Sequence, residues 1–144
     1  MGERWATFDC YGTLIDWNGG VRAELVRVFG DDRADELLDR YHEIEPEVQA
    51  EDPERTYRTV LTLALERLAE EEGVALPHGE HDALARSLPS WTPFPEVPAA
   101  LEEARARGWR THARLKASSC HYRRRLCNSR FGHSFRATAV LRTQ

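Results

Sequence analysis

The spacing of apolar residues changes near residue 17, from a short strand-like segment to a long helical one. Residues 4–9, Arg-Trp-Ala-Thr-Phe-Asp, alternate in part between apolar and polar positions. Gly12 follows closely, which indicates a short strand that enters a tight loop. From Val21 onward the apolar positions recur at helical spacing, and no segment between Trp17 and Pro89 has the pattern of a strand. We therefore predict one strand followed by an all-helical block.

Four helices are expected within this block, each with one apolar face. They run over residues 21–30, 37–46, 52–73 and 83–88. Gly30 and Gly73 end the first and third helices, because glycine favours the turn that follows a helix. Pro46 closes the second helix, since proline lacks the N–H that a helix interior requires. Asp52 is the expected N-cap of the third helix, with Pro53 at its first position.

A proline-rich segment follows the helical block. Residues 89–98 contain four prolines, a density that excludes a regular element and favours a stiff connector between two bodies. Pro98 is placed to open a further helix that stops at Gly108. Trp109 would then lead into a second strand.

Length and composition limit the class of protein. The 144 residues suffice for one domain with a core, and 41% hydrophobic with 31% charged residues is typical of a globular chain. No apolar run reaches the roughly 18 residues of a membrane span, and the first residues lack the apolar part of a secretory signal. Three widely spread cysteines form no disulfide framework. These features predict a cytoplasmic protein with reduced thiols and no membrane association.

The most informative local feature is the segment 9–14, Asp-Cys-Tyr-Gly-Thr-Leu, at the end of the first predicted strand. An acid at the carboxyl end of a strand, followed by a glycine loop, is where open α/β sheets bind ligands. A carboxylate there can attack an electrophilic carbon or phosphorus and form an ester. From spacing alone, a solvated cap is the commoner role for such an acid. Both roles stay open for Asp9 on this pattern.

This segment, followed by Ile-Asp, resembles the first motif of the haloacid dehalogenase superfamily. The likeness covers about residues 4–110 and implies an α/β fold, in which a Rossmann-like parallel sheet carries an inserted helical cap and is truncated after about its third core strand. Residues 1–16 would form the first core strand and motif loop, 17–92 the cap, and 93–144 the return to the core. The resemblance also implies that Asp9 is the catalytic nucleophile.

Tyr11 indicates which branch of the superfamily the chain resembles. Phosphatases of the superfamily carry a second Asp at this position, as a general acid for the leaving alkoxide. Halide leaves as a stable anion without a proton, and tyrosine, with a pKa of about 10, is a poor acid at about pH 7. Asp-x-Tyr-Gly-Thr is similar to the (S)-2-haloacid dehalogenases (type II), which implies hydrolytic dehalogenation of a small 2-haloacid through an aspartyl ester on Asp9. A phosphatase-like or phosphonatase-like hydrolase, or a non-catalytic fragment with a basic tail, are the alternatives left open.

The same resemblance implies substrate-binding roles for Tyr11, Thr13, Arg40 and Ser118. An arginine of the cap binds the substrate carboxylate in those dehalogenases, and Arg40 lies in the second predicted helix, where a charged helix face is the alternative. Ser118 or Ser119 would supply the hydroxyl of the second motif. Displacement of a halide involves no phosphate dianion, so no metal or other cofactor is expected. Mg²⁺ is expected only for phosphatase-like chemistry.

Charge is distributed unevenly along the chain. Residues 1–110 contain all 24 acidic residues and 12 basic ones, whereas residues 111–144 contain eight basic residues and no acid. Such a change marks a boundary, a basic tail or a segment that does not belong with the rest.

The family pattern breaks in this basic segment. Residues 111–120 place His, Arg and Lys where a buried aliphatic strand belongs, so the core strand is expected to be missing there. Residues 131–140 partly recover the pattern, but the 144 residues contain no counterpart of the Lys of the third motif. Two interpretations stay open, a tail that binds a polyanion such as nucleic acid and a loss of the reading frame after Arg110. The second is favoured, so little turnover and no nucleic-acid partner are expected. The oligomeric state, a homodimer included, stays open.

Overall fold

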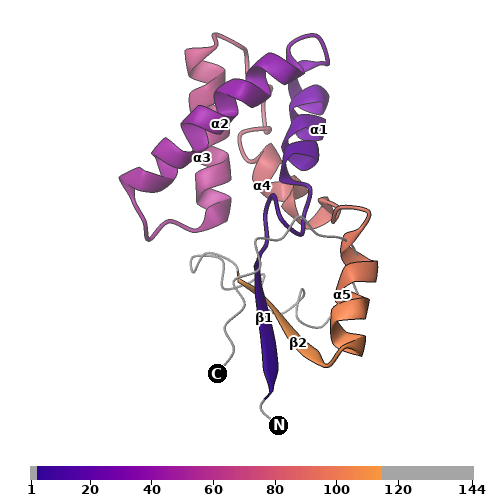
Figure 1. Ribbon diagram of the computed structural model, residues 1–144. Helices are drawn as coiled ribbons and strands as arrows, with labels where there is room; N and C mark the ends of the chain where they lie inside the picture. Colours follow the sequence, from indigo (N-terminus) through magenta and orange to yellow (C-terminus); the bar gives the residue numbers. More distant parts are fainter. Residues whose placement is uncertain (1–2, 115–144) are drawn as a thin grey trace. The chain divides into compact units, whose positions relative to one another are not determined.

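The structure, a computed structural model, describes residues 3–114. The chain divides into two compact units (Figure 1). One unit, called the α/β unit below, comprises the described residues up to Trp17 and those from Thr92 onward. The other comprises Asn18–Trp91 and is called the helical unit, so the chain passes between the units twice.

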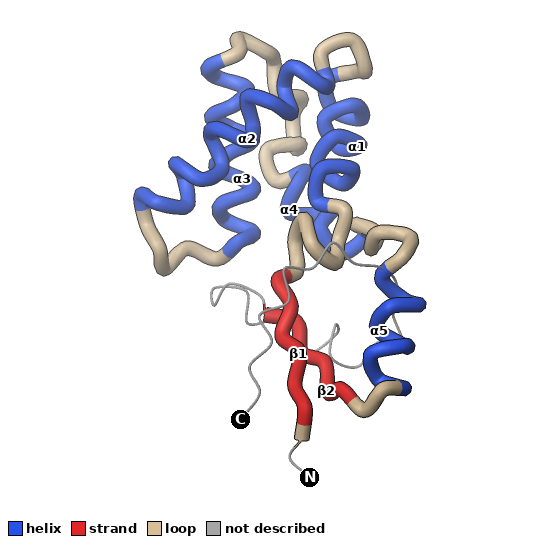
Figure 2. Tube along the Cα trace, in the orientation of Figure 1, coloured by secondary structure: helices blue, strands red, loops and turns tan. Residues whose placement is uncertain are grey.

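Two parallel strands, β1 (Arg4–Asp9) and β2 (Trp109–Arg114), form the sheet of the α/β unit (Figure 2). They pair in register, from Arg4 opposite Trp109 to Asp9 opposite Arg114. Helix α5 (Val97–Ala106) leads into β2 and contacts it. Both strands therefore end at the same edge of the sheet, with Asp9 as the last residue of β1. The predicted α/β class with a parallel sheet is confirmed.

The core of the α/β unit lies on one face of β1. Phe8 packs there with Leu14 of the following loop. Val97 and Leu101 of α5 complete this buried cluster, which Phe94 contacts from the return segment. Side chains alternate between the two faces of a strand, so Asp9, next to Phe8, lies on the opposite face and is exposed.

Two arginine–tryptophan pairs join the amino ends of the strands. The Arg4 guanidinium lies 5.0 Å from the ring centre of Trp109, and that of Arg110 lies 4.5 Å from the ring centre of Trp5. Each contact joins residues that are opposite one another in the register. Such cation–π contacts stabilise the pairing of the two strands at the end remote from Asp9.

The expectation of a missing core strand after Trp109 is wrong, because β2 continues to Arg114. Alternation along the strand explains how it tolerates polar residues. Ala113 packs against the core cluster, whereas His112 is exposed and avoids the cost of burying an unpaired polar ring. The third core strand and residues 131–140 lie outside the described residues.

The helical unit contains the helices expected from the apolar pattern. Their bounds are α1 (Trp17–Phe29), α2 (Ala34–Glu51), α3 (Tyr57–Glu71) and α4 (Ala83–Ser87), followed by a 3-10 turn, Leu88–Ser90. Helix α3 packs against both α2 and α4 (Figure 1). The prediction of no strand between Trp17 and Pro89 is confirmed. Pro89 itself lies in the 3-10 turn, so the proline-rich segment begins with a short regular element.

The prediction that the second helix ends at Pro46 is wrong. Helix α2 continues through this proline to Glu51. Proline removes one backbone hydrogen bond from the helix. The buried face continues on both sides of Pro46, however, through Ile44 and Val48, which are fully buried. Packing of this apolar face therefore outweighs the local preference of proline for ending the helix.

The N-cap of helix α3 lies four residues after Asp52, the expected cap. The Thr56 hydroxyl Oγ1 accepts a hydrogen bond from the Thr59 N–H at 3.2 Å and forms the N-cap. Asp52 instead accepts the Glu54 N–H at 3.0 Å, which closes a turn before the helix. Thr and Asp are both good N-cap residues. Which of them caps the helix depends on where the backbone becomes helical, here at Tyr57.

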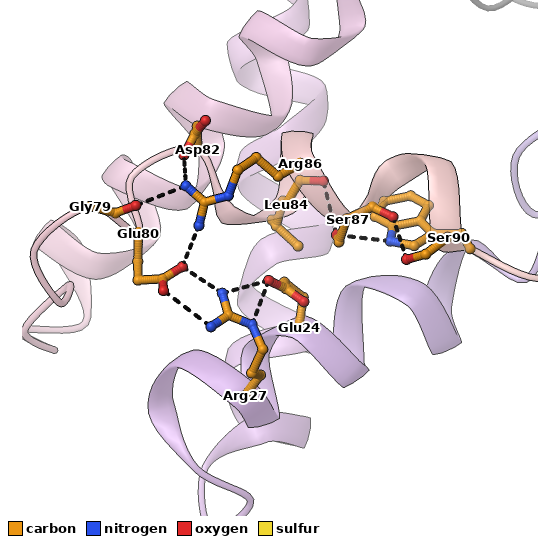
Figure 3. Close-up of polar contacts among 10 residues, drawn as sticks. Glu24, Arg27, Gly79, Glu80, Asp82, Leu84, Arg86, Ser87 and Ser90 are labelled. Atoms are coloured by element: carbon orange, nitrogen blue, oxygen red, sulfur yellow. Dashed lines mark hydrogen bonds and ion pairs between the residues drawn. The ribbon is translucent and has the colours of Figure 1, made fainter.

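Ion pairs tie the loop before α4 to α1 (Figure 3). The Arg27 guanidinium of α1 binds Glu24 on its own helix and Glu80 in the loop. Arg86 of α4 binds the same Glu80 at 2.7 Å and also Asp82. Glu80 thus joins two arginines from different helices, and these hydrogen bonds hold the pKa of its carboxyl below the ordinary value.

Candidate active site

The candidate site lies at the carboxyl end of β1. Asp9 is the last residue of the strand and is exposed. Its Oδ2 accepts a hydrogen bond from the Thr13 hydroxyl, with 3.3 Å between Oδ2 and Oγ1. The structure therefore brings together two of the predicted site residues, and the threonine orients one oxygen of the carboxylate.

The loop after β1 turns back on itself through backbone hydrogen bonds. The Cys10 carbonyl accepts the Ile15 N–H at 2.9 Å, and the Gly12 N–H donates to the Ile15 carbonyl at 2.9 Å. Gly12 has a φ of +76°, in the left-handed region that favours glycine. This tight turn is what allows Thr13 to reach back to Asp9.

These hydrogen bonds bear on the two roles that the sequence left open for Asp9. A capping carboxylate would accept the backbone N–H groups of the turn that follows it. The N–H groups of residues 12–15 instead donate to the carbonyls of Cys10 and Ile15. These backbone N–H groups do not use the Asp9 carboxylate as a cap, and its role as a nucleophile stays a prediction.

The return segment 92–94 holds the other side of the loop. The Asp16 N–H donates to the Thr92 carbonyl at 2.9 Å, and the Phe94 N–H donates to the Leu14 carbonyl at 3.2 Å. An antiparallel β-bridge lies between these two bonds. The sequence identified residues 89–98 as a connector and missed their pairing with the loop, because two residues of backbone pairing leave no periodic signal.

Cys10 follows Asp9 directly, but its side chain points inward and is 1% exposed. Burial, and secondly the charge of Asp9, raise the pKa of its thiol to about 12. A thiol that stays protonated at neutral pH is a poor nucleophile. The buried Cys10 thiol is therefore a poor candidate for a nucleophile in this loop.

Tyr11 lies in the same loop and is half-buried, in a β-bridge with Ile15. Ser118, the residue expected to supply the second-motif hydroxyl, and the neighbouring Ser119 lie outside the described residues. The structure thus places Tyr11 next to Asp9 in the chain and leaves the role of Ser118 as a prediction.

Arg40 lies in α2 of the helical unit. Its guanidinium forms ion pairs with Glu43 and Glu71, and its Nε lies 4.0 Å from Oε1 of Glu72. Hydrogen bonds from Arg40 to Glu43 and Glu71 raise its pKa. A substrate carboxylate at Arg40 would compete with these glutamates.

The other arginines of the helical unit are also engaged. Seven of its eight arginines form ion pairs, and Arg58 donates to the Ala85 carbonyl at 2.8 Å. Charge pairing therefore does not distinguish Arg40 from its neighbours as a substrate ligand.

Two further properties concern residues 3–114. No group of three or more His, Cys, Asp or Glu side chains in this range is arranged to hold a metal ion. None of the helices in this range is long and apolar enough to cross a membrane.

Comparisons with known proteins identify the fold. No model of a protein family and no curated protein matches the chain. The crystal structure of the L-2-haloacid dehalogenase RSc1362 is similar to it, with a TM-score of 0.65 and 21% identity over 78% of this chain and 52% of that one. A structure described as a dehalogenase has a TM-score of 0.64 and 18% identity over 77% of this chain and 50% of its own. The crystal structure of the L-2-haloacid dehalogenase PA0810 has a TM-score of 0.57 and 22% identity, over 78% of this chain and 51% of that one.

The chain therefore has the haloacid dehalogenase fold, as its first motif predicts. It spans about half the length of each of these three structures.

Proposed function

We propose that this chain carries the nucleophile of a hydrolase that releases halide from small 2-haloacids. The observation that carries the proposal is the carboxylate of Asp9 at the end of β1, with Thr13 Oγ1 at 3.3 Å from its Oδ2. The dehalogenase fold of the described chain supports it. The helical unit would serve as the cap over the substrate, with Arg40 and Ser118 as candidate ligands of the substrate carboxylate.

In the first step an oxygen of Asp9 attacks C2 of the haloacid from the side opposite the halogen. The new C–O bond forms as the carbon–halogen bond breaks, and the halide leaves with the bonding electron pair. The product of this step is an ester between Asp9 and the 2-carboxylate fragment. Such a covalent intermediate divides one difficult displacement into two easier steps.

In the second step water attacks the carbonyl carbon of the Asp9 ester. The bond from that carbon to the ester oxygen linked to C2 breaks, the 2-hydroxy acid leaves, and one proton passes to solvent. The hydroxyl oxygen of the product then derives from Asp9, while the oxygen of water enters the carboxylate. Neither step has a phosphate dianion to neutralise, so the mechanism requires no metal ion.

The loop supplies the positioning that this chemistry needs. Thr13 donates to Oδ2 and so fixes the rotation of the carboxylate, which aligns an oxygen for attack. Tyr11 occupies the position two residues after Asp9, where an acid would be needed for a leaving alkoxide. A leaving halide needs no such proton, so tyrosine there suits dehalogenation better than phosphate transfer.

The test compares halide release from 2-chloropropionate with phosphate release from p-nitrophenyl phosphate, each with and without Mg²⁺. Since little turnover is expected of this chain, we expect slow halide release, independent of Mg²⁺, that is lost in Asp9→Asn. The matched control is Asp16→Asn, which removes a carboxylate beyond the loop. Mg²⁺-dependent phosphate release, or halide release undiminished in Asp9→Asn after deamidation has been excluded, would contradict the proposal.

A further inference from the structure

The chain crosses between the two units at two points, and residues next to one crossing contact residues next to the other. The crossings lie between Trp17 and Asn18 and between Trp91 and Thr92. Within the α/β unit, the Asp16 N–H donates to the Thr92 carbonyl at 2.9 Å. Within the helical unit, the Trp91 ring lies against Gly20. Each unit therefore contains one contact between the two segments that cross.

The ring of Trp91 contacts Gly20 and forms a hydrogen bond with Ser87, both in the helical unit. A Cβ atom built on Gly20 would lie only 2.5 Å from Cγ and Cδ2 of the indole, so the ring occupies the space that any other residue would fill. The indole Nε1 donates to the Ser87 hydroxyl at 3.0 Å, and that hydroxyl donates in turn to the Leu84 carbonyl at 3.0 Å. The side chain is 8% exposed. These contacts fix both the place and the rotation of the ring.

Trp91 directly precedes residues 92–94, the segment that holds the loop between Asp9 and Asp16, called the nucleophile loop below. Thr92 follows Trp91 directly and accepts the Asp16 N–H, and Phe94 donates to the Leu14 carbonyl. Only Pro93 separates these two hydrogen-bonding residues, so both groups lie within three residues of Trp91 along the chain. These two hydrogen bonds hold the carboxyl end of the loop, at Leu14 and Asp16.

We infer that Trp91, seated on Gly20, is a positioning residue for the nucleophile loop. It acts through the backbone of residues 92–94 and touches no reacting atom. The inference rests on the proposed function only in that this loop carries the nucleophile. Its test measures the loop directly and needs no turnover, so a chain that releases no halide leaves the outcome intact.

The experiment is amide hydrogen exchange, followed residue by residue by NMR on the full chain. The reporters are the amides of Asp16 and Phe94. Two helical amides serve as references, Val60, which donates to Thr56 at 3.0 Å, and Arg107, which donates to Glu103 at 3.0 Å. In Gly20→Ala we expect exchange about tenfold faster at both reporters, with Arg107, which lies in the same unit as the reporters, changed by less than about twofold. Val60 lies in the helical unit and is expected to change only as much as that unit is destabilised.

Two further variants complete the design. Gly19→Ala changes the neighbouring residue, which is exposed in the same helix, and is expected to leave the reporters unchanged. Trp91→Phe keeps a ring on Gly20 but removes the bond to Ser87, and is expected to accelerate the reporters less than Gly20→Ala does. It supplies the result if Gly20→Ala does not fold.

The inference is overturned if the reporters exchange as slowly in Gly20→Ala as in the unchanged chain. If Gly20→Ala does not fold, the same result in a folded Trp91→Phe overturns it. It is equally overturned if reporters and references accelerate by the same factor, because that pattern indicates a general loss of stability rather than release of the loop.

Discussion

Replacing Gly20 by alanine is expected to destabilise the helical unit, although alanine is ordinarily the better helix former. In an exposed helix the exchange of glycine for alanine stabilises by about 0.5–1 kcal/mol. At Gly20 the new Cβ would lie 2.5 Å from two ring atoms of Trp91 and 2.8 Å from a third. The ring is rigid and 8% exposed, so the ring or the helix must move to relieve the overlap.

Overpacking of this kind costs about 1–3 kcal/mol, which exceeds the gain in helix propensity. The balance is a net loss of about 1 kcal/mol in the free energy of unfolding. If the indole leaves its seat instead, its hydrogen bond to Ser87 is lost at a similar cost, about 0.5–1.5 kcal/mol. Both routes of relief therefore destabilise the variant.

The assay is equilibrium unfolding in urea, followed by the circular dichroism of the helices, with Gly19→Ala as the control. Gly19 is exposed, so its substitution should stabilise by up to about 1 kcal/mol. Two alanines at adjacent positions should thus shift the midpoint in opposite directions. A Gly20→Ala variant as stable as Gly19→Ala would show that the ring does not fill this space, and would refute the reasoning.

Three other predictions concern stability and reactivity. Thr56→Ala removes the N-cap bond to Thr59 and should lower the free energy of unfolding by about 1 kcal/mol in the same urea assay, whereas Thr56→Ser should restore most of it. The Cys10 thiol, with its pKa raised to about 12, should resist a thiol reagent in the folded chain and react at once in urea; rapid labelling of the folded chain would contradict its burial. Hydrogen bonds from arginines lower the pKa of Glu51 and Glu80 below the ordinary 4.5, so their contribution to stability is present above that value and is lost as pH falls through the lowered pKa. The urea midpoint should accordingly fall between about pH 6 and about pH 3, by less in Glu80→Gln, and a midpoint independent of pH would contradict the ion pairs.

The features that the sequence predicts correctly are set by local chemistry. The strand at residues 4–9 and the tight turn at Gly12 follow from a short apolar run and a residue that tolerates positive φ. The helices that stop before Gly30 and near Gly73 follow from periodicity and a terminal glycine. The nucleophile loop belongs with these, because its motif is contiguous in the chain.

The features that the sequence does not predict depend on residues far apart. Helix α2 passes Pro46 because its apolar face is buried on both sides of the proline, and β2 accepts His112 because that side chain is exposed. The close approach of Trp91 to Gly20 joins residues more than 70 positions apart, with no pattern linking them. These features result from tertiary packing, which cannot be inferred from the type of one residue or its neighbours in the sequence.

The reading-frame interpretation of residues 111–144 is not decided by β2. Strand pairing uses backbone groups, so a short strand after Arg110 forms with side chains from either frame. The coding DNA decides it. The other two frames downstream of codon 110 should yield an aliphatic strand ending in Ser-Asn or Thr-Asn, and failure of both to do so would refute the interpretation.

The central claim is that Asp9 becomes esterified, and mass spectrometry tests it without requiring complete turnover. Trypsin cleaves after Arg4 and Arg22, so one peptide contains Asp9 together with Cys10 and Asp16, the competing sites of alkylation. The chain is incubated with 2-chloropropionate, quenched in acid and digested, and Asp9→Asn is treated in parallel. Hydroxylamine distinguishes the products, because it converts an ester to a hydroxamate and leaves a thioether intact.

The account predicts a 1-carboxyethyl group on Asp9 that hydroxylamine removes and that is absent from Asp9→Asn. Thr13→Val, which loses the hydrogen bond to Oδ2, should form it more slowly, by about tenfold. A modification located on Cys10 or Asp16, or one that persists undiminished in Asp9→Asn, would contradict the assignment of Asp9 as the nucleophile.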